Sequence, residues 1–166
     1  IMGAINFVTT IIQMRAPGMG FFKMPIFIWT VLAAQILQLL GLPALTGGAI
    51  MLFFDLNFGT SFFNPETGGD PVLFQHFFWF YSHPAVYVMV LPVFGIFSEL
   101  FPAYSRKPLF GYKFVALASF GITILSLVVW VHHMFYTGTP MWMRNLFMFT
   151  TMLIAVPTGV KVFAWI

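Results

Sequence analysis

The sequence predicts an all-α polytopic membrane protein. Of its 166 residues, 60% are hydrophobic, 20% are aromatic and only 7% are charged, a balance that soluble globular domains do not have. Stretches without a charged residue recur along the chain, and each exceeds the roughly 20 apolar residues that cross a bilayer as a helix. Backbone polar groups in lipid must be satisfied within their own segment, so helices are the expected element. We expect contact with membrane lipid and no nucleic-acid partner.

Five hydrophobic segments follow one another along the chain. They are a partial helix over 1–13 and spans over approximately 25–56, 72–101, 113–137 and 142–166. The first segment is too short to span alone and is interpreted as the end of a helix. The chain has no initiator methionine and no signal peptide, so it is expected to be an interior fragment of a larger polytopic protein, forming a single membrane domain over 1–166. Prolines inside the spans predict kinks, at Pro43, Pro84, Pro92 and Pro157.

The distribution of basic residues predicts the orientation of the spans. The first and third connections carry Arg15, Lys23, Arg106, Lys107 and Lys113. The second connection, over 57–70, has acidic residues but no lysine or arginine. The positive-inside rule therefore places the first and third connections in the cytoplasm, with Arg144 as a single exception on the outer side.

Three of the four histidines, His83, His132 and His133, lie deep inside these apolar spans. Ionisable side chains at bilayer depth are costly, so each is a functional-site hypothesis. With the helix directions fixed, His83 lies roughly 16 Å along its span, and the adjacent pair lies roughly 10 Å from the same face. The three imidazoles share a layer in the outer half of the membrane and predict one metal site. Neighbouring helical residues project about 100° apart, so the pair would grip one ion from two sides.

The type of metal stays open at this point, because imidazole ligands suit copper, zinc and iron alike. A single buried histidine is more often a hydrogen-bonded core residue than a ligand, and His76 keeps that interpretation. For the other three histidines it is the weaker one, because three unligated imidazoles in lipid would each need a partner.

Four more polar side chains extend this site toward the cytoplasm. Tyr87 follows His83 by four residues and lies on the same helix face, where it is either a proton and electron donor to a metal or an ordinary aromatic. Lys161, with Thr158 nearly one turn above it, either snorkels to the cytoplasmic interface or relays protons. Ser98 lies three turns below Tyr87 on roughly the same face. Together they predict a polar ladder from the cytoplasm to the metal.

Three motifs of the chain resemble, in the right order, the catalytic subunit of haem-copper terminal oxidases. They are His-Phe-Phe-Trp-Phe-Tyr-Ser-His-Pro-Ala-Val-Tyr over 76–87, Trp-Val-His-His-Met-Phe over 130–135 and Ile-Ala-Val-Pro-Thr-Gly-Val-Lys-Val-Phe over 154–163. The match extends through 3–7 and 62–65, so it covers essentially the whole chain. The resemblance implies a fragment of a twelve-helix bundle, about helices four to eight of subunit I.

The same resemblance implies roles for the residues already singled out. The three membrane histidines bind the copper of a haem-copper binuclear centre, and the haem iron ligands lie on helices outside the fragment. Tyr87, covalently joined to the His83 ring in this family, supplies a proton and an electron when the O–O bond breaks. Lys161, Thr158 and Ser98 match the lysine-type proton pathway of the family.

One departure from the family pattern concerns a second proton route. Many members carry a glutamate two residues after the first copper histidine, whereas this chain has Ala85. It also has Tyr81 and Ser82 just before His83. This looks like the variant, found among bacteria including cyanobacteria, in which a hydroxyl pair takes over the role of the carboxylate.

The resemblance therefore implies a respiratory enzyme that reduces dioxygen to water and translocates protons, with electrons from cytochrome c entering through subunit II beside other oxidase subunits. A quinol oxidase of the same family stays open, because the donor is decided in a partner subunit. The expected location is a bacterial cytoplasmic membrane, or a thylakoid membrane if the source is cyanobacterial.

Two alternatives differ in chemistry. Nitric oxide reduction with non-haem iron in place of copper is disfavoured because Tyr87 and Lys161 match the oxidase pattern. A non-enzymatic proton-coupled transporter could use buried histidine and lysine as a relay. Such a transporter would not need His132 and His133 at the depth of His83.

Overall fold

The computed structural model describes all 166 residues as helices joined by loops, with no strand. The elements in chain order are α1 (Met2–Gln13), η1 (Phe21–Lys23), α2 (Ile26–Phe58), η2 (Pro65–Thr67), α3 (Pro71–Ser105), α4 (Tyr112–Ser126), η3 (Trp130–Met134), α5 (Met141–Leu153) and α6 (Ala155–Trp165). Four segments are long and apolar enough to cross a membrane: Ile26–Phe58, Pro71–Ser105, Tyr112–Met134 and Met141–Trp165. The predicted class, an all-helical membrane protein, is confirmed.

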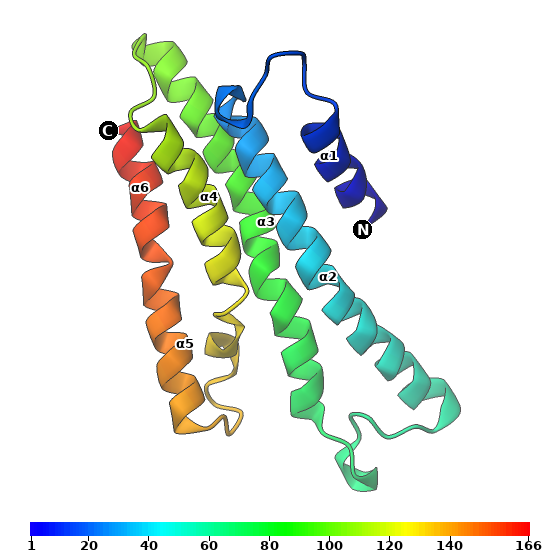
Figure 1. The fold of residues 1–166 in the computed structure, drawn as a ribbon. Coiled ribbons are helices and arrows are strands. Elements are labelled where there is room, and N and C mark those ends of the chain that lie inside the picture. The colour runs from blue at the N-terminus through cyan, green and yellow to red at the C-terminus, as the bar shows by residue number, and fades with distance from the viewer.

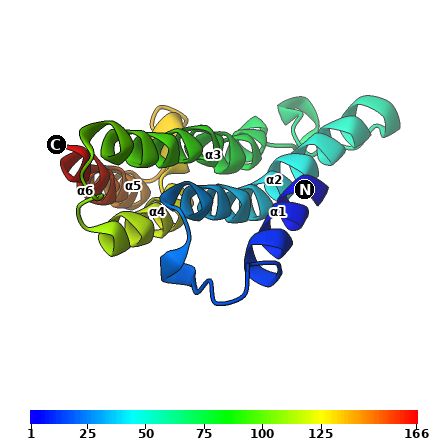
Figure 2. The ribbon, with the colours of Figure 1, turned by 90° about the horizontal axis from the view of Figure 1, so that it is seen from above.

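The long helices α2 and α3 run side by side, and α4 packs against both of them (Figure 1). The last segment, α5 followed by α6, lies along α4, while α1 lies against α2 on the side away from α6 (Figure 2). The connections over 14–25 and 106–111, which carry most of the basic residues, are at one end of the bundle, and those over 59–70 and 135–140 are at the other (Figure 1). This is the alternation that the positive-inside rule requires.

Glycines let α2 and α3 approach closely. A Cβ atom on Gly95 would lie 2.1 Å from Thr30 Oγ1 and 2.9 Å from the Cα atom of Phe27. On the opposite helix, a Cβ atom on Gly48 would lie 2.9 Å from the Cβ atom of Phe77. Small residues at the contact face let helix backbones pack tightly in membranes, where lipid is as apolar as the helix surface. The α2 and α3 pair is therefore a fixed platform for the rest of the chain.

The helix α3 begins at a well-defined point. Asp70 caps it by accepting a hydrogen bond from the Val72 amide at 2.8 Å, and Pro71 occupies the first helical position. A side-chain acceptor at the N-cap satisfies an amide that has no partner within the helix, and proline at this position loses no hydrogen bond. The start of α3 sets the position of the histidine that it carries.

The third span is not a continuous helix, in contrast to the expectation over 113–137. The helix α4 ends at Ser126, whose hydroxyl donates to the Thr123 carbonyl at 2.8 Å. The Val128 carbonyl then accepts a hydrogen bond of 2.7 Å from Thr150 on α5, outside its own helix. Side-chain donors that occupy main-chain carbonyls compete with the helical pattern. The chain continues as the short 3₁₀ helix η3, which carries two of the membrane histidines.

The last span is divided at Ile154, where α5 gives way to α6. Pro157 has no amide hydrogen, so the Leu153 carbonyl lacks its usual donor four residues later. The other prolines named above do not interrupt their helices: α2 runs on through Pro43, and α3 runs on through Pro84 and Pro92.

Candidate metal centre

Three imidazoles meet where α3 faces η3. His83 Nδ1 lies 3.0 Å from His132 Nε2 and 3.1 Å from His133 Nε2. One ligand atom from each ring lies within 4.8 Å of the others, which is an arrangement that could hold a metal ion. Nitrogens bound to a single transition ion at about 2.0–2.1 Å each lie within about 4 Å of one another. The structure thus brings together the three histidines that the sequence singled out.

The two adjacent histidines reach His83 from a 3₁₀ turn, whereas we expected a regular helix. Their ring planes are inclined by 55°, with centroids 4.4 Å apart. A 3₁₀ helix turns by about 120° per residue, so consecutive side chains diverge slightly more than in an α-helix. His83 is buried and lies near both rings, so that the pair approaches it from two sides.

A threonine that the sequence analysis did not single out fixes the proton on one of these rings. Thr151 Oγ1 donates its hydrogen to the Phe147 carbonyl at 2.5 Å and lies 2.8 Å from His132 Nδ1. Because a hydroxyl has only one hydrogen, Thr151 accepts from the Nδ1–H group of His132. The neutral ring then directs the Nε2 lone pair at His83. This is the tautomer that a metal ligand needs, with its other nitrogen held by an outer partner.

The ring of His133 is held by aromatic stacking. The indole of Trp79 lies parallel to it, with ring centroids 4.0 Å apart and planes inclined by 3°. Trp79 precedes His83 by four residues, so the same face of α3 supplies one imidazole and a platform for another.

The remaining nitrogen of His83 has no partner. Its Nε2 atom is buried and forms no hydrogen bond, which is costly for a polar atom. The ring of Tyr87 is the adjacent aromatic on α3, with its centroid 5.1 Å from that of His83. A single proton on His83 Nδ1 cannot form full hydrogen bonds to both His132 Nε2 and His133 Nε2. One cation between the three nitrogens would bind all of them. The donor set therefore fits a metal that favours imidazole, such as copper.

The fourth histidine stands outside the cluster. His76 Nδ1 accepts a hydrogen bond of 3.2 Å from Trp130 Nε1. Trp130 also packs edge-on against Phe80 and Phe147. His76 is thus a hydrogen-bonded packing residue, and its contact ties the beginning of η3 to α3.

Lys161 does not reach the end of the bundle. Its side chain is fully buried, and Nζ donates to Ser119 Oγ at 2.8 Å and to the Val115 carbonyl at 3.3 Å. Of the two interpretations, a lysine that snorkels to the cytoplasmic interface and a proton relay, the burial of Lys161 contradicts the first, and the second stays a prediction. Sequence analysis missed Ser119. The signal that could have identified it is the run of hydroxyl residues in a charge-free stretch, at Ser119, Thr123 and Ser126.

The expected polar ladder is not joined by direct hydrogen bonds. Thr158 donates to the Ile154 carbonyl of its own helix at 2.9 Å. Ser98 donates to the Phe94 carbonyl at 2.7 Å and accepts a hydrogen bond of 3.0 Å from Trp165 Nε1. A proton that moved between these groups would need intervening water or a side-chain rotation.

Tyr81 and Ser82, the hydroxyl pair before His83, differ in their hydrogen bonding. The Tyr81 hydroxyl donates to Gln38 Oε1 on α2 at 3.3 Å. Gly41 leaves room for this ring, since a Cβ atom there would lie 3.2 Å from Tyr81 Cδ2. The half-buried Ser82 hydroxyl forms no hydrogen bond within the chain.

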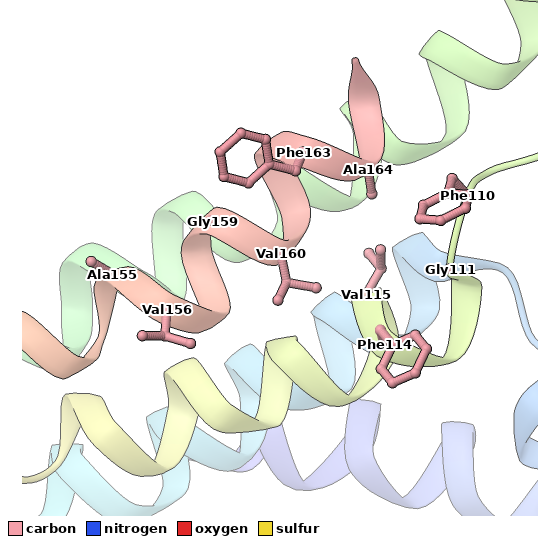
Figure 3. A pocket seen from close by; sticks show the side chains of 10 residues that line it. All are labelled: Phe110, Gly111, Phe114, Val115, Ala155, Val156, Gly159, Val160, Phe163 and Ala164. Carbon is pink, nitrogen blue, oxygen red and sulfur yellow. The ribbon is translucent and has the colours of Figure 1, made fainter.

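A cavity of about 600 Å³ is separate from the histidines. It is an apolar groove between α4 and α6 (Figure 3), lined by Phe110, Gly111, Phe114, Val115, Ala155, Val156, Gly159, Val160, Phe163 and Ala164. None of these side chains is titratable, so the groove offers no group for proton or electron chemistry.

The fold and the site define a polytopic membrane protein with a candidate three-histidine metal centre and a buried lysine. The family model described as "Cytochrome C and Quinol oxidase polypeptide I" matches residues 1–166. The chain therefore belongs to this family, which is that of the haem-copper oxidases, and the resemblance inferred from the motifs is confirmed.

Individual relatives agree with the family match. The chain is 59% identical over 165 residues to "Cytochrome c oxidase subunit 1" of Synechocystis sp. (strain ATCC 27184 / PCC 6803 / Kazusa), which covers 99% of the chain. It is 53% identical to the protein of that name from Thermostichus vulcanus and 51% identical to that from Cereibacter sphaeroides, in both cases over all 166 residues. The chain spans about 30% of the length of these curated relatives, with 30%, 30% and 29% covered.

Proposed function

We propose that this chain is the copper-binding part of the catalytic subunit of a respiratory terminal oxidase that reduces dioxygen to water. The observation that carries the proposal is the convergence of three imidazole nitrogens, with His83 Nδ1 within 3.1 Å of both His132 Nε2 and His133 Nε2. Membership of the oxidase family supports the same conclusion independently of the geometry.

The three histidines would hold copper, which together with the haem iron would supply the redox centre at which dioxygen is reduced. The contact between Thr151 and His132 keeps one nitrogen unprotonated and available as a ligand. The parallel stack of Trp79 restricts rotation of the His133 ring. These contacts set the direction of the ligand atoms before any metal binds, so little reorganisation is needed on binding.

Tyr87 would supply a proton and an electron from its phenol. Its ring lies beside that of His83, with centroids 5.1 Å apart, and the Nε2 atom of His83 has no hydrogen-bond partner. This placement supports the covalent bond between the two rings that the family resemblance implies, because such a bond would occupy the nitrogen that otherwise has no partner.

Protons would reach the site from the cytoplasmic end, coupled to proton translocation across the membrane. Lys161 is the only charged side chain that is fully buried, which supports a role in moving protons through the inner half of the bundle. Thr158 and Ser98 lie on the route, and Tyr81 with Ser82 would replace the missing glutamate of the second route. Water would bridge the gaps between these hydroxyl groups.

Electrons would come from cytochrome c through subunit II, within an assembly of several oxidase subunits. The names of the three relatives favour cytochrome c over quinol as the donor. The membrane would be the bacterial cytoplasmic membrane, or the thylakoid membrane in a cyanobacterium.

The test is a metal analysis of the purified intact parent protein, together with oxygen consumption driven by reduced cytochrome c. We expect copper in the catalytic subunit, iron fully accounted for by haem, and loss of copper in His132→Ala and in His133→Ala. His76→Gln is the matched control and should keep its copper. Iron in excess of haem without copper would instead indicate nitric oxide reductase chemistry, and the absence of both metals would favour a transporter.

A further inference from the structure

We propose that Ser119 is a positioning residue for Lys161: its hydroxyl holds the lysine amine against α4 and so keeps it ready to carry a proton toward the metal centre. The inference rests on the proposed function for the proton step, whereas the contact between Ser119 and Lys161 is structural and can be tested separately.

The Lys161 amine has few polar neighbours, and the Ser119 hydroxyl is the closest of its hydrogen-bond acceptors. Lys161 has no exposed surface, and its amine has two acceptors, the Ser119 hydroxyl at 2.8 Å and the Val115 carbonyl at 3.3 Å. No carboxylate forms an ion pair with it, and Glu99 on α3 accepts a hydrogen bond from the Phe27 amide. A buried ammonium group without an ion-pair partner depends on such neutral acceptors.

Ser119 is itself held in the orientation that this role requires. Its hydroxyl donates to the Val115 carbonyl at 3.2 Å, which leaves the oxygen lone pairs for the lysine. Thr123 donates to the Ser119 carbonyl at 3.0 Å, and its oxygen lies 3.4 Å from the Ala33 carbonyl of α2. Ser119 is completely buried, so no solvent competes for its oxygen. The acceptor is therefore in place before the lysine is charged.

This contact turns the lysine toward α4 and away from the other polar groups of α6. The hydroxyl of Thr158, three residues before Lys161, donates to the Ile154 carbonyl of its own helix. The amine must therefore leave Ser119 to pass a proton onward, and it returns there when it is charged again. The same chain segment continues from α4 into η3, where two of the candidate copper ligands lie. Removing the Ser119 oxygen would disfavour the charged lysine and slow proton delivery.

The experiment measures proton uptake on reduction of the metal centre in the purified intact parent protein, followed with a pH-sensitive dye. Ser119→Ala should slow uptake roughly tenfold, the effect of losing one hydrogen bond to a charged group. Ser119→Thr keeps the hydroxyl and should restore most of the rate. Thr30→Val is the matched control, because it removes another fully buried hydroxyl, one that donates only to the Phe27 carbonyl of its own helix. Haem spectra and copper content should equal those of the parent protein.

A double-mutant cycle with Lys161→Met separates positioning from a general structural role. If Ser119 acts through the lysine, Ser119→Ala adds nothing to the slow uptake of Lys161→Met. The proposal would be overturned if Ser119→Ala took up protons at the parent rate while Lys161→Met was slow. It would also be overturned if the effects of the two substitutions were additive in the double variant. A Lys161→Met variant as fast as the parent would overturn the proton step as well.

Thermal unfolding provides a readout that does not depend on the oxidase reaction. Ser119→Ala should lower the melting temperature in the parent protein and leave it unchanged in the Lys161→Met background. An equal decrease in melting temperature in both backgrounds would refute the claim that Ser119 holds Lys161. A parent protein that contains no copper and consumes no oxygen would refute the proposed function, while this stability cycle would still decide whether Ser119 holds Lys161.

Discussion

The indole of Trp79 lies flat against the imidazole of His133, with ring centroids 4.0 Å apart and an angle of 3° between the planes. The two residues come from different elements, α3 and η3, and the stack is one of the contacts that join these elements around the candidate metal centre. The stack therefore bears on the orientation of a candidate ligand ring.

Replacing Trp79 should therefore weaken metal binding. An aromatic pair contributes about 0.5–1.5 kcal/mol beyond the area that it buries, so Trp79→Leu should lower copper affinity roughly 2-fold to 10-fold. Trp79→Phe keeps a smaller stack and should lose less. The measurement is copper retained by the intact parent protein during dialysis against a chelator. Trp142→Leu, at a side chain that is 63% exposed, is the control, and equal retention in both leucine variants would argue against a role for the stack.

The hydrogen bond between Thr151 and His132 should matter more. Thr151→Val preserves the shape of the side chain but removes the acceptor that holds the Nδ1–H group of the imidazole. Loss of such an outer partner lowers metal affinity by about 10-fold to 100-fold. Chelator competition on the intact parent protein measures the change. Thr46→Val is the matched control, because Thr46 is exposed on α2 and bonds only to its own helix. Unchanged affinity in Thr151→Val would show that the tautomer is fixed by other means.

The packing of α2 against α3 depends on Gly95. An alanine there would place its Cβ atom 2.9 Å from the main-chain Cα atom of Phe27, which cannot move without shifting the helix. Overpacking of this kind costs about 1–3 kcal/mol, so Gly95→Ala should lower the melting temperature in detergent. Gly47→Ala is the control, since nothing lies within 4 Å of its Cβ position. It should be neutral or slightly stabilising, because alanine favours a helix more than glycine does. Similar melting temperatures for the two variants would contradict the packing argument.

The hydrogen bond from Trp165 to Ser98 ties the end of α6 to α3. Trp165→Phe keeps the aromatic contacts with Phe94, Phe97 and Phe101 but removes the indole donor. The expected loss of stability is about 1 kcal/mol, measured by thermal unfolding of the intact parent protein. Trp142→Phe should have a smaller effect. In the Ser98→Ala background the loss should disappear, and a loss of the same size there would show that the two residues act independently.

Much of the architecture could be predicted from local properties of the chain. The four membrane-length segments follow from runs of apolar residues, and the convergence of His83, His132 and His133 was expected from their depths estimated with the rise per residue of a helix. The short 3₁₀ turn could not be predicted this way. It depends on the hydrogen bond from Thr150 to the Val128 carbonyl, which joins residues 22 positions apart in the sequence.

The sequence by itself determined that the chain forms membrane helices, and it determined which ionisable side chains lie within them, because hydropathy and helical rise are properties of contiguous residues. The tertiary structure decided what each of those side chains contacts. Lys161 bonds to Ser119, 42 positions away, and His132 bonds to Thr151, 19 positions away. Such pairs depend on how each helix is rotated about its axis and on how closely α2, α3 and α4 approach. The combined packing of all the helices sets both, and no single segment encodes either.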